Sequence, residues 1–240
     1  MTEGVDKYAG RVAVVTGARR GIGKMIADHF LSEGARVIGI ARGGPATEHD
    51  RYAHFALDIG DDHAVRAAFH EIGRQFQTVD IVVNNAAVLT SQYALIMPAT
   101  DARDMVSTNL LGTMFVSREA AKLMSRTKYG RIINIGSMAS ALEPAGDSVY
   151  AATKAAVIAM AGVLARELGG FNITCNTLGV TAIPTDMLAQ LPRQKIEAVI
   201  ASLPLPRFAT ADDILNVIDF FASERSSYIT AQTVFLGGVH

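Results

Sequence analysis

The chain lacks several features that mark other classes of protein. It has one cysteine among 240 residues, Cys175, so no disulfide can form within the chain. Its 22 basic and 23 acidic residues leave a net charge of −1, which gives no sign of a nucleic acid as a partner. Its six histidines form no cluster with cysteine or carboxylate residues at zinc-ligand spacing, so we expect no catalytic metal.

Long apolar runs are also missing. No segment reaches the roughly 18 consecutive apolar residues that a membrane-spanning helix needs. Residues 1–7 include acidic side chains and no apolar stretch, which predicts neither a signal peptide nor a membrane anchor. We therefore expect a cytoplasmic protein without a membrane partner. Half of its residues are hydrophobic, which is enough for one substantial core.

Short apolar, β-branched runs alternate with longer segments of helical spacing along the chain. This alternation predicts right-handed β-α-β units, and hence a parallel sheet with helices on both faces. The predicted fold class is α/β, a single-domain Rossmann fold over residues 1–240 with a doubly wound, seven-stranded parallel sheet. Strands are expected at 11–16, 36–40, 53–57, 80–84, 131–135, 172–176 and 233–236. Helices are expected near 23–33, 61–76, 101–126, 148–168, 185–201 and 211–222.

A glycine-rich turn joins the first strand to the first helix. Residues 16–23 read TGARRGIG. The glycines permit a tight turn and let the backbone approach a pyrophosphate, while the helix N-terminus supplies amide donors. A strand, glycines and a helix in this order indicate a dinucleotide site much more strongly than the glycines alone.

The end of the second strand predicts which dinucleotide is bound. An acidic residue there would accept hydrogen bonds from the ribose 2′-hydroxyl and repel a 2′-phosphate. This chain has Ile40, Ala41 and Arg42 instead, and Arg19 and Arg20 add positive charge in the turn. A guanidinium pairs with phosphate in a forked geometry, so we expect a preference for NADP(H) over NAD(H).

A phenol, an ammonium and a hydroxyl form the candidate catalytic set. Tyr150 and Lys154 are four residues apart, which puts them on one face of a helix, and Ser137 lies upstream. A phenol with its ordinary pKa of about 10 is a poor acid-base group near neutral pH. We expect the charge of Lys154 to lower the pKa of Tyr150 toward the working pH.

These segments together resemble the short-chain dehydrogenase/reductase family, and are most similar to its 3-oxoacyl-(acyl carrier protein) reductases. The resemblance covers the chain from Arg11 to Gly238. It rests on residues 16–23, Asp58, Asn84-Asn85-Ala86, Asn109, Gly136-Ser137, Tyr150 with Lys154, Asn176, Thr185-Asp186-Met187 and Ile229-Thr230 with Gln232-Thr233.

The resemblance implies a role for each member of the catalytic set. Tyr150 would exchange a proton with the substrate oxygen, and Ser137 would donate a hydrogen bond to the same oxygen. Lys154 would hold the nicotinamide ribose, and Asn109 would hold a water of a proton relay. The cofactor-binding residues implied or expected are Gly17, Arg19, Arg20, Gly21, Ile22, Gly23, Arg42, Asp58, Ile59, Asn85, Ala86, Tyr150, Lys154, Ile183 and Thr185.

The chain departs from the family pattern at two places. Val180 and Thr181 stand where the family usually has Pro-Gly, so the loop expected after Asn176 should take a different path. Carrier-protein reductases usually present basic residues near the site mouth. Arg126 and Lys128 are the candidates here, while Phe171 or Asn172 occupies the second basic position.

The predicted activity is NADPH-dependent reduction of a ketone to a secondary alcohol, or the reverse. The substrate would be a 3-oxoacyl thioester on acyl carrier protein or coenzyme A, or another small carbonyl compound. A ketone of secondary metabolism is one alternative, and a non-catalytic cofactor-binding scaffold or regulator is another. Small residues along 151–165 let helices approach closely, and the resemblance implies that this helix pairs with its symmetry mate in a homodimer or homotetramer. A proline-rich segment at 184–206 predicts a substrate flap, with an apolar wall formed by Met138, Met187, Leu188 and Leu191.

Overall fold

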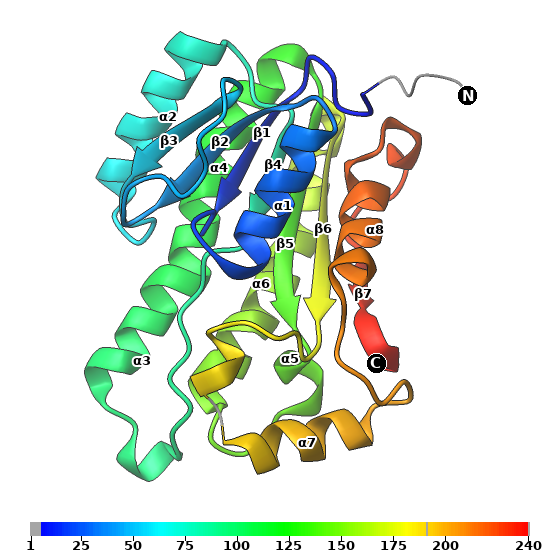
Figure 1. Cartoon of the computed structure of the whole chain (residues 1–240). Helices are drawn as coiled ribbons and strands as arrows, with labels where there is room; N and C mark the ends of the chain where they lie inside the picture. Colours follow the sequence, from blue (N-terminus) through cyan, green and yellow to red (C-terminus); the bar gives the residue numbers. More distant parts are fainter. Residues whose placement is uncertain (1–5, 191, 240) are drawn as a thin grey trace.

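Parallel strands form a seven-stranded sheet in the computed structural model, which describes residues 6–190 and 192–239 (Figure 1). The strand order is β3-β2-β1-β4-β5-β6-β7, so the chain winds outward in both directions from β1. A crevice forms at the carboxyl ends where the winding reverses, between β1 and β4. The predicted α/β fold with a doubly wound sheet is confirmed. The strands are β1 Val12–Thr16, β2 Arg36–Ala41, β3 Tyr52–Ala56, β4 Ile81–Asn84, β5 Gly130–Ser137, β6 Ile173–Val180 and β7 Thr233–Phe235.

Helices cover both faces of this sheet (Figure 1). Helices α1 and α8 pack on one face, and α2, α4 and α6 pack on the other. The α-helices are α1 Gly21–Ser32, α2 Asp62–Phe76, α3 Ala99–Met105, α4 Thr113–Thr127, α5 Ala139–Leu142, α6 Ser148–Leu168, α7 Arg193–Ser202 and α8 Ala211–Ala222. Shorter helical turns are η1 Ala94–Ile96, the π-helical η2 Val106–Gly112, η3 Gly169–Phe171, η4 Leu188–Gln190, η5 Glu224–Ser226 and η6 Leu236–Gly238.

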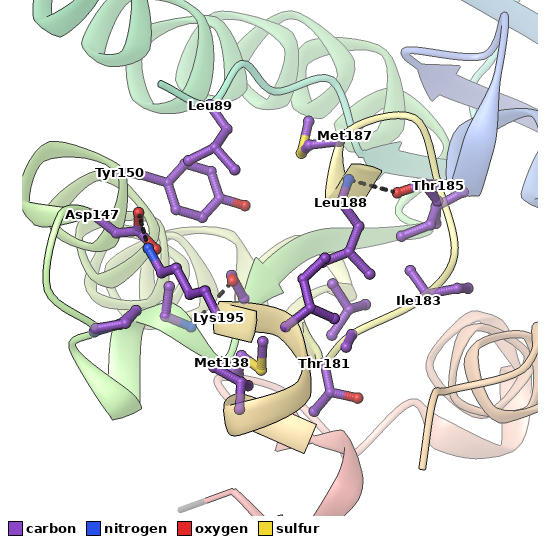
Figure 2. A pocket seen from close by; sticks show the side chains of 18 residues that line it. Leu89, Met138, Asp147, Tyr150, Thr181, Ile183, Thr185, Met187, Leu188 and Lys195 are labelled. Carbon is purple, nitrogen blue, oxygen red and sulfur yellow. Dashed lines mark hydrogen bonds and ion pairs between the residues drawn. The ribbon is translucent and has the colours of Figure 1, made fainter. Parts of the chain in front are cut away.

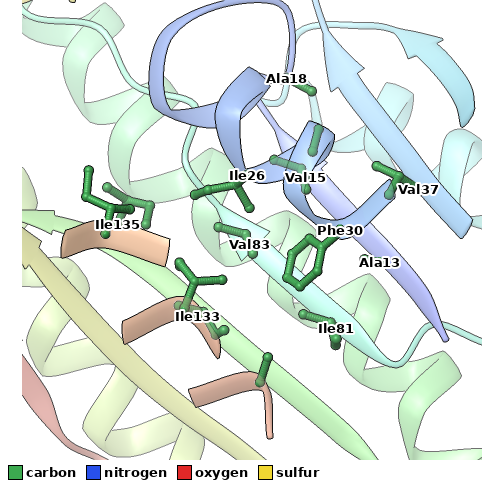
Figure 3. Packing of buried hydrophobic residues seen from close by; sticks show 14 of the residues in the cluster. Ala13, Val15, Ala18, Ile26, Phe30, Val37, Ile81, Val83, Ile133 and Ile135 are labelled. Atoms are coloured by element: carbon green, nitrogen blue, oxygen red, sulfur yellow. The ribbon is translucent and has the colours of Figure 1, made fainter. Parts of the chain in front are cut away.

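The continuous apolar strands follow from burial on both faces. In β1, Ala13 and Val15 point toward Ile26 and Phe30 of α1 (Figure 3). The alternate residue Val14 belongs to the opposite core, with side chains from α2 and α4. The sheet is thereby held rigidly between two apolar layers, and its carboxyl edge becomes a fixed platform for the site.

Several element boundaries differ from the prediction, and two of them bear on the site. The expected helix at 185–201 is instead η4 followed by α7, because Pro192 fits the start of a helix but not its interior. The sixth strand was expected to end at Asn176 but continues to Val180. The Val180 carbonyl accepts a hydrogen bond from the Met138 backbone N–H at 2.9 Å, which extends the pairing of β6 with β5. Val180 therefore ends the strand, and the loop begins at Thr181.

The segment Ser148–Phe171, which contains α6, is long and apolar enough to cross a membrane by length and composition. This differs from our expectation that no segment would reach that length. Its inward side carries Val157, Ala161 and Ala165, which are buried. The latter two belong to the core under the sheet. Core helices of globular proteins meet the same criterion, so the finding is weak evidence for a membrane span.

Candidate active site

Two adjoining hollows open at the carboxyl ends of the strands. The larger is a cleft with an empty volume of about 1580 Å³, lined by the glycine-rich turn and the ends of β2 to β5. The smaller is a mostly apolar pocket of about 760 Å³. Tyr150 lines both, together with Ile22, Val180, Thr185 and Met187. A molecule in the cleft and a molecule in the pocket would therefore meet at the Tyr150 side chain.

The cleft collects most of the predicted cofactor residues. Gly23 and Ile183 are the exceptions. Gly23 is buried beneath the turn, and a Cβ atom there would lie 2.3 Å from the Gly17 carbonyl oxygen. Ile183 lines the apolar pocket instead. The predicted residues that line the cleft are Gly17, Arg19, Arg20, Gly21, Ile22, Arg42, Asp58, Ile59, Asn85, Ala86, Tyr150, Lys154 and Thr185.

Hydrogen bonds from β1 and β4 fix the glycine-rich turn. Gly17 has a positive φ of 69°, and a Cβ atom there would lie 2.7 Å from Asn85 Nδ2. Thr16 Oγ1 accepts hydrogen bonds from the backbone N–H groups of Asn85 and Ala86, at 2.9 and 3.0 Å. Sequence reasoning gave Thr16 no such role. The resulting cradle, with the α1 N-terminus behind it, fits a pyrophosphate.

The arginines of the cleft differ in their partners. Arg20 Nη1 pairs with the exposed Asp186 carboxylate at 3.2 Å. Within residues 6–190 and 192–239, neither Arg19 nor Arg42 has an ion-pair partner. Asp58, at the end of β3, accepts a hydrogen bond from the Gly60 N–H at 2.8 Å. Among the residues that the structure describes, the guanidinium groups of Arg19 and Arg42 in the cleft therefore lack a carboxylate partner.

The Tyr150 phenol is buried near the end of β5, where Ser137 ends the strand. Burial raises the pKa of Tyr150 to about 12, the Ser137 side chain opposes the shift by hydrogen bonding, and the Asp147 charge adds to it. We expected a lowered pKa, so in the chain alone this expectation is wrong. The desolvation of a buried phenolate outweighs the other effects. Tyr150 is therefore protonated at neutral pH.

Lys154 lies one helical turn after Tyr150 and is also buried. Its Nζ donates a hydrogen bond to the Ile135 carbonyl at 2.7 Å and lies 5.8 Å from the centroid of the Tyr150 ring. Burial lowers the pKa of Lys154 to about 8, because the charged ammonium is desolvated.

Asn109 lies in the π-helical segment η2 between α3 and α4. Its Oδ1 accepts from the Val88 backbone N–H at 2.8 Å. Its Nδ2 donates to the Val88 carbonyl at 2.9 Å and to Thr153 Oγ1 at 3.2 Å. Isolated π-helical turns often occur at functional sites. Through these hydrogen bonds, Asn109 connects Val88 in the loop after β4 with Thr153 of α6, the helix that carries Tyr150 and Lys154.

The apolar pocket has one charged cluster at its wall (Figure 2). Lys195 Nζ from α7 lies 3.0 Å from Asp147 Oδ1 and donates to Ser91 Oγ at 2.9 Å. Ser91 Oγ donates to the same Asp147 oxygen at 2.5 Å. No spacing in the sequence indicates this cluster, because its members come from three separate segments. Met138, Met187 and Leu188 line the pocket as predicted, while Leu191 lies outside the described residues.

Arg126 and Lys128 do not lie near the mouth of the pocket. They sit at the C-terminal end of α4, just before β5 begins at Gly130. Tyr150 and Ser137 are at the opposite end of that strand, about 23 Å away over the seven steps from Gly130 to Ser137 at roughly 3.3 Å each. The expectation that these basic residues flank the site mouth is therefore wrong within one chain.

The fold and the cleft together define the class: a dinucleotide-binding α/β protein of the Rossmann type, with a buried tyrosine and lysine at its reactive end. Comparison of the sequence with known protein families identifies the family within this class. A family model described as enoyl-(acyl carrier protein) reductase matches residues 17–240. The chain belongs to the short-chain dehydrogenase/reductase family and is an oxidoreductase.

Individual relatives cover nearly the whole chain. The 3-oxoacyl-[acyl-carrier-protein] reductase FabG of Pseudomonas aeruginosa is 37% identical over an alignment of 238 residues, with coverage of 95% of this chain and 96% of that protein. The Escherichia coli protein of the same name is 33% identical over 96% of this chain and 97% of its own length. The crystal structure of levodione reductase has a TM-score of 0.89 at 25% identity, covering 96% of this chain and 97% of that chain.

Proposed function

We propose that the protein reduces a ketone to a secondary alcohol with NADPH. The observation that carries this proposal is the position of Tyr150, whose protonated phenol is shared by the cleft and the apolar pocket. A general acid is needed where a carbonyl oxygen gains charge, and a phenol with a raised pKa holds its proton until that moment. Below its raised pKa the phenol carries the proton that the reduction step needs.

The nicotinamide, when bound in the cleft, would supply a hydride to the carbonyl carbon. Tyr150 would give its proton to the carbonyl oxygen, which completes the alcohol and leaves a phenolate. The Ser137 hydroxyl would donate a hydrogen bond to the same oxygen as its charge develops. Lys154 would hold the nicotinamide ribose and stabilise the phenolate. Asn109 would hold a water that returns a proton to the site through Lys154.

The preference for NADPH rests on the adenosine end of the cleft. Arg19 and Arg42 carry no carboxylate partner in the described part of the chain, and β2 ends in Ala41 without an acid. A ribose 2′-phosphate would neutralise both guanidinium groups through charge-assisted hydrogen bonds. NADH offers only a hydroxyl at that position, so it would gain little from either arginine.

The substrate class follows from the apolar pocket and from the relatives. The names of the two similar reductases specify 3-oxoacyl groups on acyl carrier protein. Leu89, Met138, Ile196 and Val199 offer an apolar surface that suits an acyl chain or another small carbonyl compound. A ketone of secondary metabolism would suit the same surface. We also propose a cytoplasmic location, because of the similarity to these reductases. The alternative function is that of a cofactor-binding scaffold without turnover.

A turnover assay tests this function. The purified protein would be mixed with NADPH or NADH and with 3-oxoacyl thioesters of coenzyme A, which stand in for the carrier-bound substrate, or with small ketones. The proposal expects loss of the reduced-nicotinamide absorbance with NADPH and at least one carbonyl compound. Binding of NADPH without turnover of any of them would favour the scaffold.

We also propose that one domain spans the chain.

A second copy of the chain is proposed to pack on α6. The outward side of α6 carries small residues at Ala152, Ala155 and Ala159, next to the exposed Val163. Small side chains let two helices approach closely, which suits a homodimer or homotetramer.

The segment 184–206 is proposed to be a flap that closes the substrate pocket. Lys195 would hold it in place through its contacts with Asp147 and Ser91.

Replacing Lys195 with methionine should raise the KM for the carbonyl substrate about tenfold, which corresponds to the loss of one hydrogen bond to a charged group. The affinity for NADPH should stay unchanged. Steady-state kinetics would measure both. The matched control is Arg193→Met on the same helix, where the exposed guanidinium pairs with Glu197. Equal effects of both variants would refute this role of Lys195.

The lowered pKa of Lys154 predicts how NADPH affinity depends on pH. With a pKa of about 8, the ammonium is charged below pH 8 and neutral above it. Because the ammonium would donate stronger hydrogen bonds to the ribose than the neutral amine, the Kd for NADPH should rise above pH 8, by at most about tenfold per pH unit. Calorimetric titration at a series of pH values on both sides of pH 8 would show the change. Lys154→Met should bind more weakly and lack this pH dependence.

A further inference from the structure

Two side chains of β3 lie beneath the adenosine end of the cleft without lining it. Tyr52 and His54 alternate with Ala53 along the strand and therefore point to the same face of the sheet. Both are partly buried. Neither has a role in the proposed chemistry, and no motif in the sequence singles them out.

His54 holds the backbone at the end of β2. Its Nε2 lies 2.6 Å from the Gly43 carbonyl oxygen, and its Nδ1 lies 3.3 Å from the Tyr52 hydroxyl. A carbonyl oxygen can only accept, so Nε2 carries a proton. In the neutral ring, Nδ1 is then the acceptor, and the Tyr52 hydroxyl donates to it. Burial raises the pKa of Tyr52, so this hydroxyl retains its proton.

Two glycines make this arrangement possible. A Cβ atom on Gly39 of β2 would lie 1.9 Å from the Tyr52 hydroxyl oxygen, so the absence of a side chain there gives the phenol its place. A Cβ atom on Gly43 would lie 2.3 Å from Arg19 Nη1. The Arg19 guanidinium therefore lies directly against the residue whose carbonyl His54 holds. Arg42, the other cleft arginine without a partner in the described residues, precedes that residue.

We propose that His54, oriented by Tyr52, is a positioning residue for recognition of the cofactor 2′-phosphate. It fixes the backbone at Gly43, so that Arg19 rests on a rigid surface and Arg42 projects from a fixed point. The inference rests on the proposed use of NADPH. Preorganised donors bind an anion more tightly because they lose less conformational freedom on binding. The affinity for NADH, which lacks the 2′-phosphate, should not depend on His54.

The experiment is calorimetric titration of the full chain with NADPH and with NADH. His54→Ala should raise the Kd for NADPH about tenfold, the equivalent of one lost hydrogen bond, and change the Kd for NADH less than about twofold. His54→Gln keeps an N–H near the position of Nε2 and should restore most of the NADPH affinity. The exposed His63 on α2 provides the control His63→Ala, which should change neither constant.

The outcomes separate this inference from the proposed function. A wild-type protein without NADPH preference would refute the NADPH proposal, and this inference with it. If wild type prefers NADPH but His54→Ala weakens both cofactors equally, or neither, then the positioning role is wrong. Tyr52→Phe keeps the ring and removes only the hydroxyl, so it provides a second test if His54→Ala does not fold. It should lower NADPH affinity selectively and by a smaller factor, and an unchanged affinity would contradict the proposal.

Discussion

Tyr150→Phe should lower turnover by about 10³-fold or more while NADPH affinity changes little. General acid catalysis contributes about 10²–10⁴-fold, and this variant removes the acid. The ring itself stays in place, because phenylalanine fills the same buried volume between the cleft and the pocket. The loss should therefore appear in kcat and not in the Kd for NADPH. Steady-state kinetics with a 3-oxoacyl thioester and calorimetric titration with NADPH would measure the two quantities.

Tyr93→Phe is the matched control for this variant. It makes the same chemical change at a phenol that is 67% exposed and lies in the loop before η1. Its turnover should stay within about twofold of wild type, as is usual for surface substitutions. Turnover by Tyr150→Phe at the level of this control would show that another group supplies the proton.

Removing both Arg19 and Arg42 should abolish the preference for NADPH. In the double variant Arg19→Ala with Arg42→Ala, the Kd for NADPH should rise about 100-fold, the worth of two charge-assisted hydrogen bonds of about 1.5 kcal/mol each. The Kd for NADH should change little, because the ribose hydroxyl makes no ion pair. Calorimetric titration with both cofactors would measure the change in their ratio.

Two further variants keep this test specific. Arg66→Ala removes an exposed helical arginine that pairs with Asp62, and should alter neither Kd. Arg20→Ala removes a guanidinium that already pairs with Asp186, so its effect should be smaller than that of the double variant. A double variant that weakens NADPH and NADH equally would show that the arginines shape the cleft without reading the phosphate.

The central strands of the sheet could be predicted because they are buried on both faces. Residues 11–16 and 131–135 are short runs rich in apolar, β-branched residues, as such strands require. The boundaries near the site were less predictable. The extension of β6 to Val180 depends on its pairing with β5 and on the hydrogen bond that the Met138 N–H, just after β5, donates to the Val180 carbonyl. No local pattern records these contacts. Tertiary pairing overrides local composition there.

The cleft residues were predictable where one short segment carries the chemistry. The glycine-rich turn and the Tyr150–Lys154 pair are local patterns with a physical meaning. The contacts of Lys195 and the support at His54 were not, because their partners are distant in the sequence. The pKa of Tyr150 was predicted in the wrong direction for a similar reason. Spacing shows a nearby charge, but it does not show how completely the phenol is removed from water.

The most direct test of the account is to follow the hydride itself. The purified protein would be incubated with a 3-oxoacyl thioester and NADPH carrying deuterium at the transferable position of the nicotinamide. Mass spectrometry of the product should find one deuterium on the carbinol carbon, and none when Tyr150→Phe replaces the wild-type protein over the same period. An alcohol without deuterium, or no alcohol from any carbonyl compound that the pocket admits, would contradict the assignment of this protein as an NADPH-dependent ketone reductase.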